Sequence, residues 1–378
     1  MVDNTFPHQL LHQAATQPAL VALRHKYLGI WHQQSWRELS DEVGSLARAL
    51  AELGLGQGDT LVLLTYPRRE ALLLSMAAQW LGAIAAPVDP DLDKDTLALL
   101  LSHLQSRFVF AEGQDQVGQA LLHGATRVVY AEARGMTAYS HENLHAYIEL
   151  VQTDTKGVHP LMAREQDVAF ALYRITDEQQ VQVEHFRHVE LLQEGRHLVL
   201  TERLGQREEA FAARVFATSG HLRYLLSPWL TAGFTLNFPE NIVTRDADRR
   251  ELGPTLVVGT RETYQRLESL VKARLPIAGS YVGRFVTYAL QSDGSRFQKL
   301  LAYWLIKRPL KDVIGFSHIH LPLLIGPALS QESLHFFRSL GIHIRTWDKI
   351  ANWRTLSATT SNKLLAETQT DSIKRALS

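Results

Sequence analysis

The sequence predicts an α/β fold built on parallel sheets, and three observations lead to this prediction. Short apolar strands alternate with helical segments through the first 150 residues, as in the succession 60–64, 69–82 and 83–88. These strands are continuous apolar runs, which is typical of strands covered by helices on both faces. The chain has 378 residues, of which 46% are hydrophobic, so it can bury a large core.

The N-terminal part begins with a predicted hairpin, in which strands at 20–23 and 30–36 are joined by the turn-prone Leu28–Gly29. Ser35 and Glu38 have the spacing of a capping box and predict a helix that ends near Gly54. Further segments continue the alternation of helix and strand, namely a helix at 95–105, a strand at 107–113, a helix at 115–124 and a strand at 127–132.

The second half is predicted to repeat this organisation. Residues 167–173 are a strand, and 181–186 alternate with period two, so the run between them is interpreted as the turn of a hairpin. The remaining predicted elements are a helix from 189, strands at 233–240 and within 251–260, a helix at 263–275, strands at 319–326 and 341–347, and a helix at 330–341 between them. We predict subdomains at 1–160 and 161–353, followed by a polar tail at 354–378, helical or loose.

Composition excludes several classes of protein. Lys plus Arg and Asp plus Glu both number 39, so no overall field favours nucleic acid or an anionic membrane. Cysteine is absent, which removes disulfides and thiolate metal sites. The N-terminus lacks the pattern of a signal peptide, and no apolar run is long enough to span a membrane. We therefore expect a cytoplasmic protein with no membrane span and no nucleic-acid partner.

Five segments occur in an order that resembles one known family. They are GIWHQQSWRELSDEVGSLARALAELGLGQGDTLVLL, LGAIAAPVDP, RFVFAEGQDQV, GFTLNFPENIVTRDADRRELGPT and GPALSQESLHFFRSLGI, which together span roughly residues 20 to 345. This series resembles adenylate-forming enzymes, most closely the N-terminal part of bacterial long-chain acyl-CoA synthetases. The resemblance implies two stacked, mostly parallel sheets with flanking helices. It also implies activation of a fatty acid with ATP and Mg, followed by transfer to coenzyme A.

The family's phosphate-binding loop reads approximately Tyr-Thr-Ser-Gly-Thr-Thr-Gly-x-Pro-Lys-Gly, and residues 173–188 align with it. Only the ends match, at Tyr173 and His188. The substituted positions are Arg174 and Ile175 for the hydroxyl residues, Thr176, Gln179 and Val183 for the glycines, Val181 for the proline, Gln182 for the lysine, and Asp177 and Glu178 for the threonines. Side chains would obstruct the approach of a phosphate, and two carboxylates would repel it.

The family's adenine motif is degenerate as well, because Asp348, Lys349, Ile350, Ala351 and Asn352 stand in its place. We also expect no counterpart of the family's barrel and C-terminal domain. We therefore expect a non-catalytic relative, without ATP, Mg or coenzyme A as cofactors, that acts as a scaffold for a protein partner, a second copy of itself or an acyl ligand. The resemblance places a candidate acyl pocket near Gly233, Phe234, Val258 and Gly259.

Two other interpretations remain open at this point. A partner could complete a residual fatty-acid adenylating and CoA-ligase activity, or the chain could be a decayed gene product with no selected role. Several side chains also have a functional and a structural interpretation. We expect Arg174 to lie on an exposed turn, the histidine pairs 185/188 and 318/320 to be structural, the charged run 245–250 to be a solvated face, and 300–310 to be a buried amphipathic helix.

Overall fold

The computed structural model describes residues 4–136, 142–152, 159–214, 216–276, 300, 302–347 and 352–356, and these form two sheets. The eight-stranded sheet has the order β15-β9-β8-β4-β3-β5-β6-β7. Its strands are β3 (Thr60–Leu64), β4 (Ile84–Val88), β5 (Phe108–Ala111), β6 (Arg127–Tyr130), β7 (Leu144–Ala146), β8 (Val168–Ile175), β9 (Val181–Arg187) and β15 (Arg354–Thr355). All neighbours are parallel except β9, which is antiparallel to both β8 and β15.

The seven-stranded sheet has the order β14-β13-β12-β10-β11-β1-β2. Its strands are β1 (Val21–Tyr27), β2 (Ile30–Ser35), β10 (Glu209–Phe211), β11 (Thr235–Phe238), β12 (Leu256–Gly259), β13 (Leu321–Leu324) and β14 (Arg345–Thr346). Only the hairpin β1–β2 is antiparallel. The predicted fold class is thus confirmed, and no closed barrel forms within the residues described.

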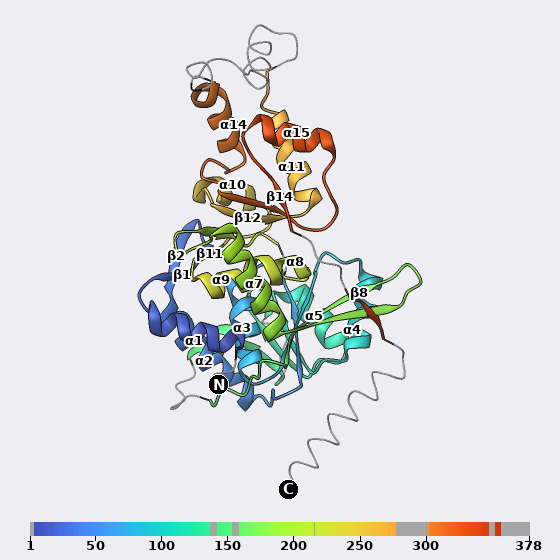
Figure 1. The fold of residues 1–378 in the computed structure, drawn as a ribbon. Coiled ribbons are helices and arrows are strands. Elements are labelled where there is room, and N and C mark those ends of the chain that lie inside the picture. The colour runs from blue at the N-terminus through green and yellow to red at the C-terminus, as the bar shows by residue number, and fades with distance from the viewer. Residues whose placement is uncertain are drawn as a thin grey trace.

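Helices separate and cover the two sheets (Figure 1). They are α1 (Phe6–Thr16), α2 (Trp36–Glu52), α3 (Arg69–Trp80), α4 (Lys94–Leu104), α5 (Gln114–Leu122), α6 (Tyr147–Gln152), α7 (His188–Glu202), α8 (Ser219–His221), η2 (Leu222–Leu226), α9 (Ser227–Ala232), α10 (Arg245–Leu252), α11 (Arg261–Lys272), η3 (Tyr303–Lys307), α14 (Arg308–Val313) and α15 (Gln331–Ser339). None of these helices is both long and apolar enough to cross a membrane.

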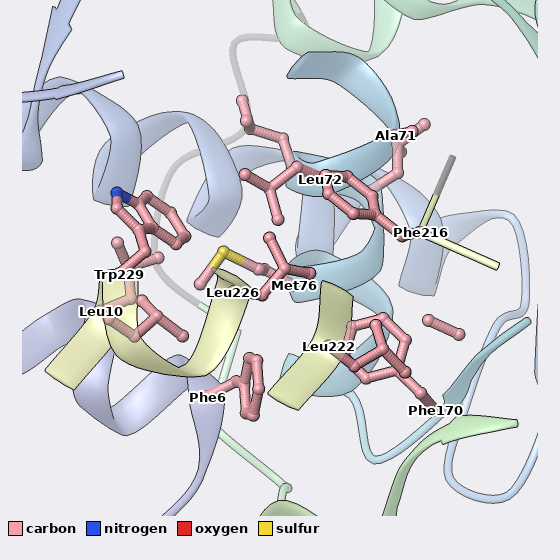
Figure 2. Close-up of a cluster of buried hydrophobic side chains, with 14 of the residues drawn as sticks. Phe6, Leu10, Ala71, Leu72, Met76, Phe170, Phe216, Leu222, Leu226 and Trp229 are labelled. Atoms are coloured by element: carbon pink, nitrogen blue, oxygen red, sulfur yellow. The ribbon is translucent and has the colours of Figure 1, made fainter. Parts of the chain in front are cut away.

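The central core lies between the sheets and is built mainly from helical residues. Phe6 of α1, Met76 of α3 and Trp229 of α9 meet there, together with Phe170 from β8 (Figure 2). A second cluster packs α4 and α5 on the other face of the eight-stranded sheet, and a third packs α11 and α15 on the other face of the seven-stranded sheet. The layers therefore alternate between helices and sheets, which buries the central parallel strands such as β3, β5, β12 and β13.

Local sequence signals explain where α2 begins and ends. The Ser35 side chain accepts a hydrogen bond from the Glu38 backbone N–H, and a Glu38 carboxylate oxygen accepts one from the Ser35 backbone N–H at 2.8 Å. This predicted capping box is confirmed. Gly54 follows the helix with φ of +91°, which glycine adopts without steric cost.

Three expectations about segments were wrong. Residues 354–356 do not belong to a loose or helical tail, because β15 pairs with β9 there. The charged run 245–250 is not wholly solvated: it starts helix α10, where Asp248 and Arg249 are buried. The segment 300–310 is not a buried amphipathic helix, since of its described residues in η3 and α14 only Ile306 is buried.

Each sheet draws strands from both sides of residue 160. Strands β1 and β2 join the later strands of the seven-stranded sheet, whereas β8 and β9 join the earlier strands of the eight-stranded sheet. A border at residue 160 therefore does not coincide with the border between the sheets.

Candidate functional site

The segment that aligns with a phosphate-binding loop is a closed β-hairpin in the structure. After an irregularity between Val168 and Phe170, strands β8 and β9 pair continuously up to Ile175 and Val181, and the hairpin projects from the body of the molecule (Figure 1). Thr176 closes the turn, because its backbone N–H donates to the Gln180 carbonyl at 2.9 Å and its carbonyl accepts from the Gln179 N–H at 2.9 Å. Gln179 adopts the left-handed conformation, with φ of 59°. The turn's amide groups are thus partly used within the turn itself.

The carboxylates of the turn are directed to local partners or to solvent. Asp177 and Glu178 are both exposed. A hydrogen bond from the Thr176 side chain lowers the pKa of Glu178, so this carboxylate stays ionised. An anion that approached this turn would meet negative charge, as predicted from the sequence.

The outer edge of β9 is covered by the segment 352–356. Arg354 and Thr355 of β15 pair with Val183 and Gln182, and the Leu356 N–H donates to the Val181 carbonyl at 2.9 Å. The three positions of β9 that align with proline, lysine and glycine of a phosphate loop are therefore ladder residues in the centre of a three-stranded ribbon.

Arg174 is engaged in this ribbon rather than free to hold an anion. Its Nε donates to Gln182 Oε1 at 2.9 Å, and its guanidinium lies over the Trp353 ring, 4.4 Å from the ring centre. Gln182 in turn donates to Thr355 Oγ1 at 3.1 Å. The residue at the lysine position of the family's loop thus links two strands.

His188 is not the N-cap of helix α7, which is Arg187. It is the first residue of that helix and is buried, and its Nδ1 accepts a hydrogen bond from the Phe6 N–H at 3.2 Å. Burial, with a smaller effect from the charge of His8, lowers the pKa of His188 to about 3. A neutral ring is needed to accept this bond, so His188 ties α1 to α7 and is structural.

Asn352, the last residue of the segment that aligns with the adenine motif, also makes a structural contact. The Asn352 N–H donates to Glu184 Oε1 at 3.1 Å, and Glu184 is paired with Arg223. Asp348 lies outside the described residues. Across the ranges that the structure describes, no group of three or more His, Asp or Glu side chains is arranged to hold a metal ion.

The strands of both sheets end around a cavity of about 350 Å³, here called the central cleft. The carboxyl ends of parallel strands are where α/β proteins commonly bind ligands. The cleft is lined by residues that follow or end β4, β8 and β10 and by the beginning of α10: Tyr66, Pro87, Val88, Asp89, Asp91, Leu92, Thr96, Leu100, Tyr173, Arg174, Ile175, Ala213, Arg214, Ala217, Thr218, Ile242 and Arg245.

Two predicted site residues, Tyr173 and Arg174, thus line this cleft. Burial raises the pKa of Tyr173 to about 12, so its hydroxyl stays protonated and can donate a hydrogen bond. Tyr66, which also lines the cleft, donates to Asp91 at 2.5 Å. This hydrogen bond to Asp91, together with burial, raises the pKa of Tyr66 to about 12. Neither tyrosine can act as a base near neutral pH.

A larger cavity of about 790 Å³ shares Tyr66 and Ile242 with the central cleft. Its charged groups are largely paired with each other. Arg68 bonds Glu70 at 2.8 Å, Glu132 at 3.1 Å and Glu112 at 3.6 Å. This cavity therefore offers volume but few charges that are available to a ligand.

The four residues of the candidate acyl pocket do not come together. Gly233 and Phe234 lie before the start of β11, where the positive φ of Gly233, 73°, ends α9. Val258 and Gly259 lie at the other end of the sheet's strands, at the end of β12. Of these four residues, Val258 lines a cavity of about 140 Å³, and the acyl pocket stays a prediction.

Sequence reasoning missed two arginines of the central cleft. Arg214 lies after β10, and Arg245 is the first residue of α10. A signal was present in the second case, because Arg245 and Arg249 are four residues apart and so lie on one face of a helix. The alternating charges of the run 245–250 concealed it.

Comparisons with known proteins agree with the resemblance. Residues 10–173 match the family model described as AMP-binding enzyme. A stretch of 99 residues, 26% of the chain, is 31% identical to N-(5-amino-5-carboxypentanoyl)-L-cysteinyl-D-valine synthase of Amycolatopsis lactamdurans and covers 3% of that protein.

Solved structures share the fold at low sequence identity. The A-PCP didomain of carboxylic acid reductase from Segniliparus rugosus, in complex with AMP, superposes with a TM-score of 0.70 at 13% identity, covering 92% of this chain and 52% of that one. The anthranilate CoA ligase AuaEII with anthranoyl-AMP superposes with a TM-score of 0.69 at 13% identity, covering 93% of this chain and 60% of that one. Apo MatB from Rhodopseudomonas palustris superposes with a TM-score of 0.67 at 17% identity, covering 91% of this chain and 59% of that one. The chain thus spans between half and three fifths of the length of these structures.

Proposed function

We propose that this chain is a non-catalytic member of the adenylate-forming (AMP-binding) enzymes, whose family model matches residues 10–173, and that it binds a carboxylic acid without activating it. The single observation that carries this proposal is the closed hairpin β8–β9 at the position of the phosphate loop. An acyl ligand in the clefts between the sheets is the occupant that we favour, and a protein partner is the alternative.

The hairpin does not fit the polyphosphate of ATP. A phosphate loop needs backbone N–H groups that point at the phosphates and a cation beside them. Here Val181, Gln182 and Val183 are ladder residues, and the N–H groups of Thr176 and Gln179 are bonded within the turn. The nearest cation, Arg174, is held by Gln182 and Trp353.

Electrostatics oppose ATP as well. Asp177 and Glu178 are exposed on the turn, and the pKa of Glu178 is lowered. At an effective dielectric constant of about 20, two like charges 4 Å apart repel each other by about 4 kcal/mol before screening by salt. A repulsion of this order lowers affinity by roughly a thousandfold, and the missing N–H contacts would lower it further.

A carboxylic acid could bind without a phosphate loop, and two cavities offer room for such a ligand. The central cleft and the larger cavity beside it, of about 350 and 790 Å³, are of the size that small organic ligands occupy. Apolar side chains such as Leu92, Leu100 and Ile242 line the central cleft beside Arg214 and Arg245. This combination suits an acid with an apolar part.

The test measures activation and binding separately. We expect no ATP–pyrophosphate exchange with fatty acids of varied chain length, and no binding of ATP with Mg by isothermal titration calorimetry. We expect a rise in melting temperature with at least one fatty acid or acyl-CoA. Fatty-acid-dependent exchange, by the purified chain or with a co-purified partner, would establish residual ligase activity and end the proposal.

A complementary measurement addresses the scaffold role. If no fatty acid or acyl-CoA raises the melting temperature, the ligand part of the proposal fails. If size-exclusion chromatography with light scattering shows a monomer, and purification from the native cell recovers no partner protein, the partner part fails as well.

A further inference from the structure

A second, smaller cavity adjoins the central cleft, and we call it the arginine cavity. It has a volume of about 140 Å³ and lies between the seven-stranded sheet and helices α10 and α11. Its lining residues are Phe211, Ala213, Arg214, Arg245, Arg249, Val257, Val258, Glu262, Thr263 and Arg266. Ala213, Arg214 and Arg245 line both cavities, so the arginine cavity adjoins the cleft at these residues.

The fold brings the four arginines together from three separate elements. Arg245 and Arg249 are four residues apart on α10, so both face the same side of that helix. Arg266 comes from α11, and Arg214 from the loop after β10. Phe211 of β10 and Val257 and Val258 of β12 also line the cavity. Apolar lining lowers the local dielectric and strengthens the field of the guanidinium groups.

Arg249 provides the observation that points to a ligand. Its residue exposure is 2%, its Nε donates to the Ile314 carbonyl at 2.7 Å, and its Nη1 donates to Asp246 Oδ1 at 2.8 Å. Its Nη2 is buried and has no acceptor among the described residues. A buried N–H donor of a charged group without an acceptor is costly, so an acceptor supplied by a ligand would remove that cost.

The charges around the cavity do not cancel. Asp246 accepts from both Arg249 and Arg266, and Glu262 accepts from Thr260 at 2.5 Å. These two carboxylates, together with Asp91 of the central cleft, which also acts on Arg245, are fewer than the four guanidinium groups. Arg245 has no ion pair within the described residues, and burial, followed by repulsion from Arg266, lowers its pKa. The cavity therefore carries an excess of positive charge.

We propose that the arginine cavity binds an oxyanion group of a small molecule, either a phosphate or a carboxylate. Guanidinium groups recognise both through paired, charge-assisted N–H···O bonds. The volume admits one such group, and the continuity with the central cleft lets the rest of the molecule extend there. The inference rests on the proposed function and deepens it, because it gives the anionic group of the bound acid a site on α10, α11 and the loop after β10, and not on the β8–β9 turn.

The test titrates the purified full chain with sodium phosphate and, separately, with sodium succinate, by isothermal titration calorimetry at low ionic strength. Sodium chloride of equal ionic strength is the reference. We expect saturable binding of at least one of the two anions. The substitution Arg245→Gln should weaken it about tenfold or more, since a hydrogen bond to a charged group is lost.

The matched control is Arg250→Gln, which removes the same charge from the exposed face of the same helix. It should leave the anion's dissociation constant within about twofold. Arg266→Gln is a second cavity variant and should act like Arg245→Gln. Failure of both anions to bind, or equal weakening by Arg250→Gln, would overturn the inference. The proposed function is judged separately by pyrophosphate exchange, so the two can fail independently.

Discussion

The guanidinium of Arg174 stacks on Trp353 at 4.4 Å from the ring centre, and this contact joins the β8–β9 hairpin to the segment 352–356. Arg174 stands at the place where the family's loop has a hydroxyl residue. Arg174 therefore does not serve phosphate binding but helps to hold β15 against the edge strand β9. Covering an edge in this way also blocks further strand pairing.

We predict that Arg174→Ala loosens β15 without unfolding the protein. Cation–π contacts at exposed sites stabilise by about 0.5–1 kcal/mol, and the bond to Gln182 is lost as well. Hydrogen–deuterium exchange should show faster exchange of the Leu356 amide, which donates to Val181. Arg187→Ala is the control, because Arg187 is exposed on the same hairpin and is paired with Glu190. Unchanged protection of Leu356 in Arg174→Ala would contradict the prediction.

A buried charge network supports the inner side of the same hairpin. Arg223 bonds both carboxylate oxygens of Glu194 at 2.5 Å and lies 3.5 Å from Glu184. Its guanidinium also lies over the Phe186 ring at 4.9 Å. Glu184 is buried and has few other partners, since its Oε2 finds no hydrogen-bond donor in the described part of the chain.

We predict that Arg223→Ala lowers the free energy of unfolding by about 3–5 kcal/mol, because it leaves a buried carboxylate without its counter-charge. Urea unfolding monitored by circular dichroism measures the loss. The double variant with Glu184→Gln should recover part of it, since the uncompensated charge is then absent. A loss no greater than that of Arg187→Ala would show that the network does not support the fold.

The buried His188 predicts a dependence of stability on pH. Its folded-state pKa is about 3, compared with 6.5 in the absence of burial. The unfolded chain therefore binds a proton below about pH 6.5, and the folded chain does not until the pH is near 3. The contribution of neutral His188 is fully present above pH 6.5 and falls by roughly 1.4 kcal/mol per pH unit as the pH decreases below that value.

The variant His188→Asn retains an acceptor for the Phe6 N–H but cannot titrate in this range. Its free energy of unfolding, measured in urea between pH 7 and pH 5, should decrease less steeply than that of the unchanged protein. His12→Asn is the control, because His12 is exposed on α1. If His188→Asn and the unchanged protein show parallel pH profiles, the histidine is not buried in its neutral form.

The sequence predicts most elements but only part of the site, and the difference lies in the range of the interactions. The capping box at Ser35 and Glu38 is local, so it is readable from four residues. The burial of Arg249 depends on a carbonyl at Ile314, 65 positions later, and sequence patterns in α10 carry no trace of that partner. Strand β15 likewise forms because β9 offers a free edge, a property of the assembled sheet rather than of residues 354–355.

Gly195 illustrates a close helix contact that leads to the last prediction. It lies on α7, where a Cβ atom would come within 2.5 Å of Ser227 Cβ and 2.7 Å of the Ser227 backbone carbon. Backbone atoms of α9 cannot move aside easily, so Gly195→Ala should destabilise by about 1–3 kcal/mol through overpacking. Gly44→Ala is the matched control, since Gly44 is also helical and buried but a Cβ there meets nothing within 4 Å. It should be neutral or stabilise by about 0.5–1 kcal/mol, because alanine favours a helix over glycine. Thermal and urea unfolding of the two variants distinguish these outcomes, and equal stability of the two would mean that α7 and α9 are less closely packed than the structure indicates.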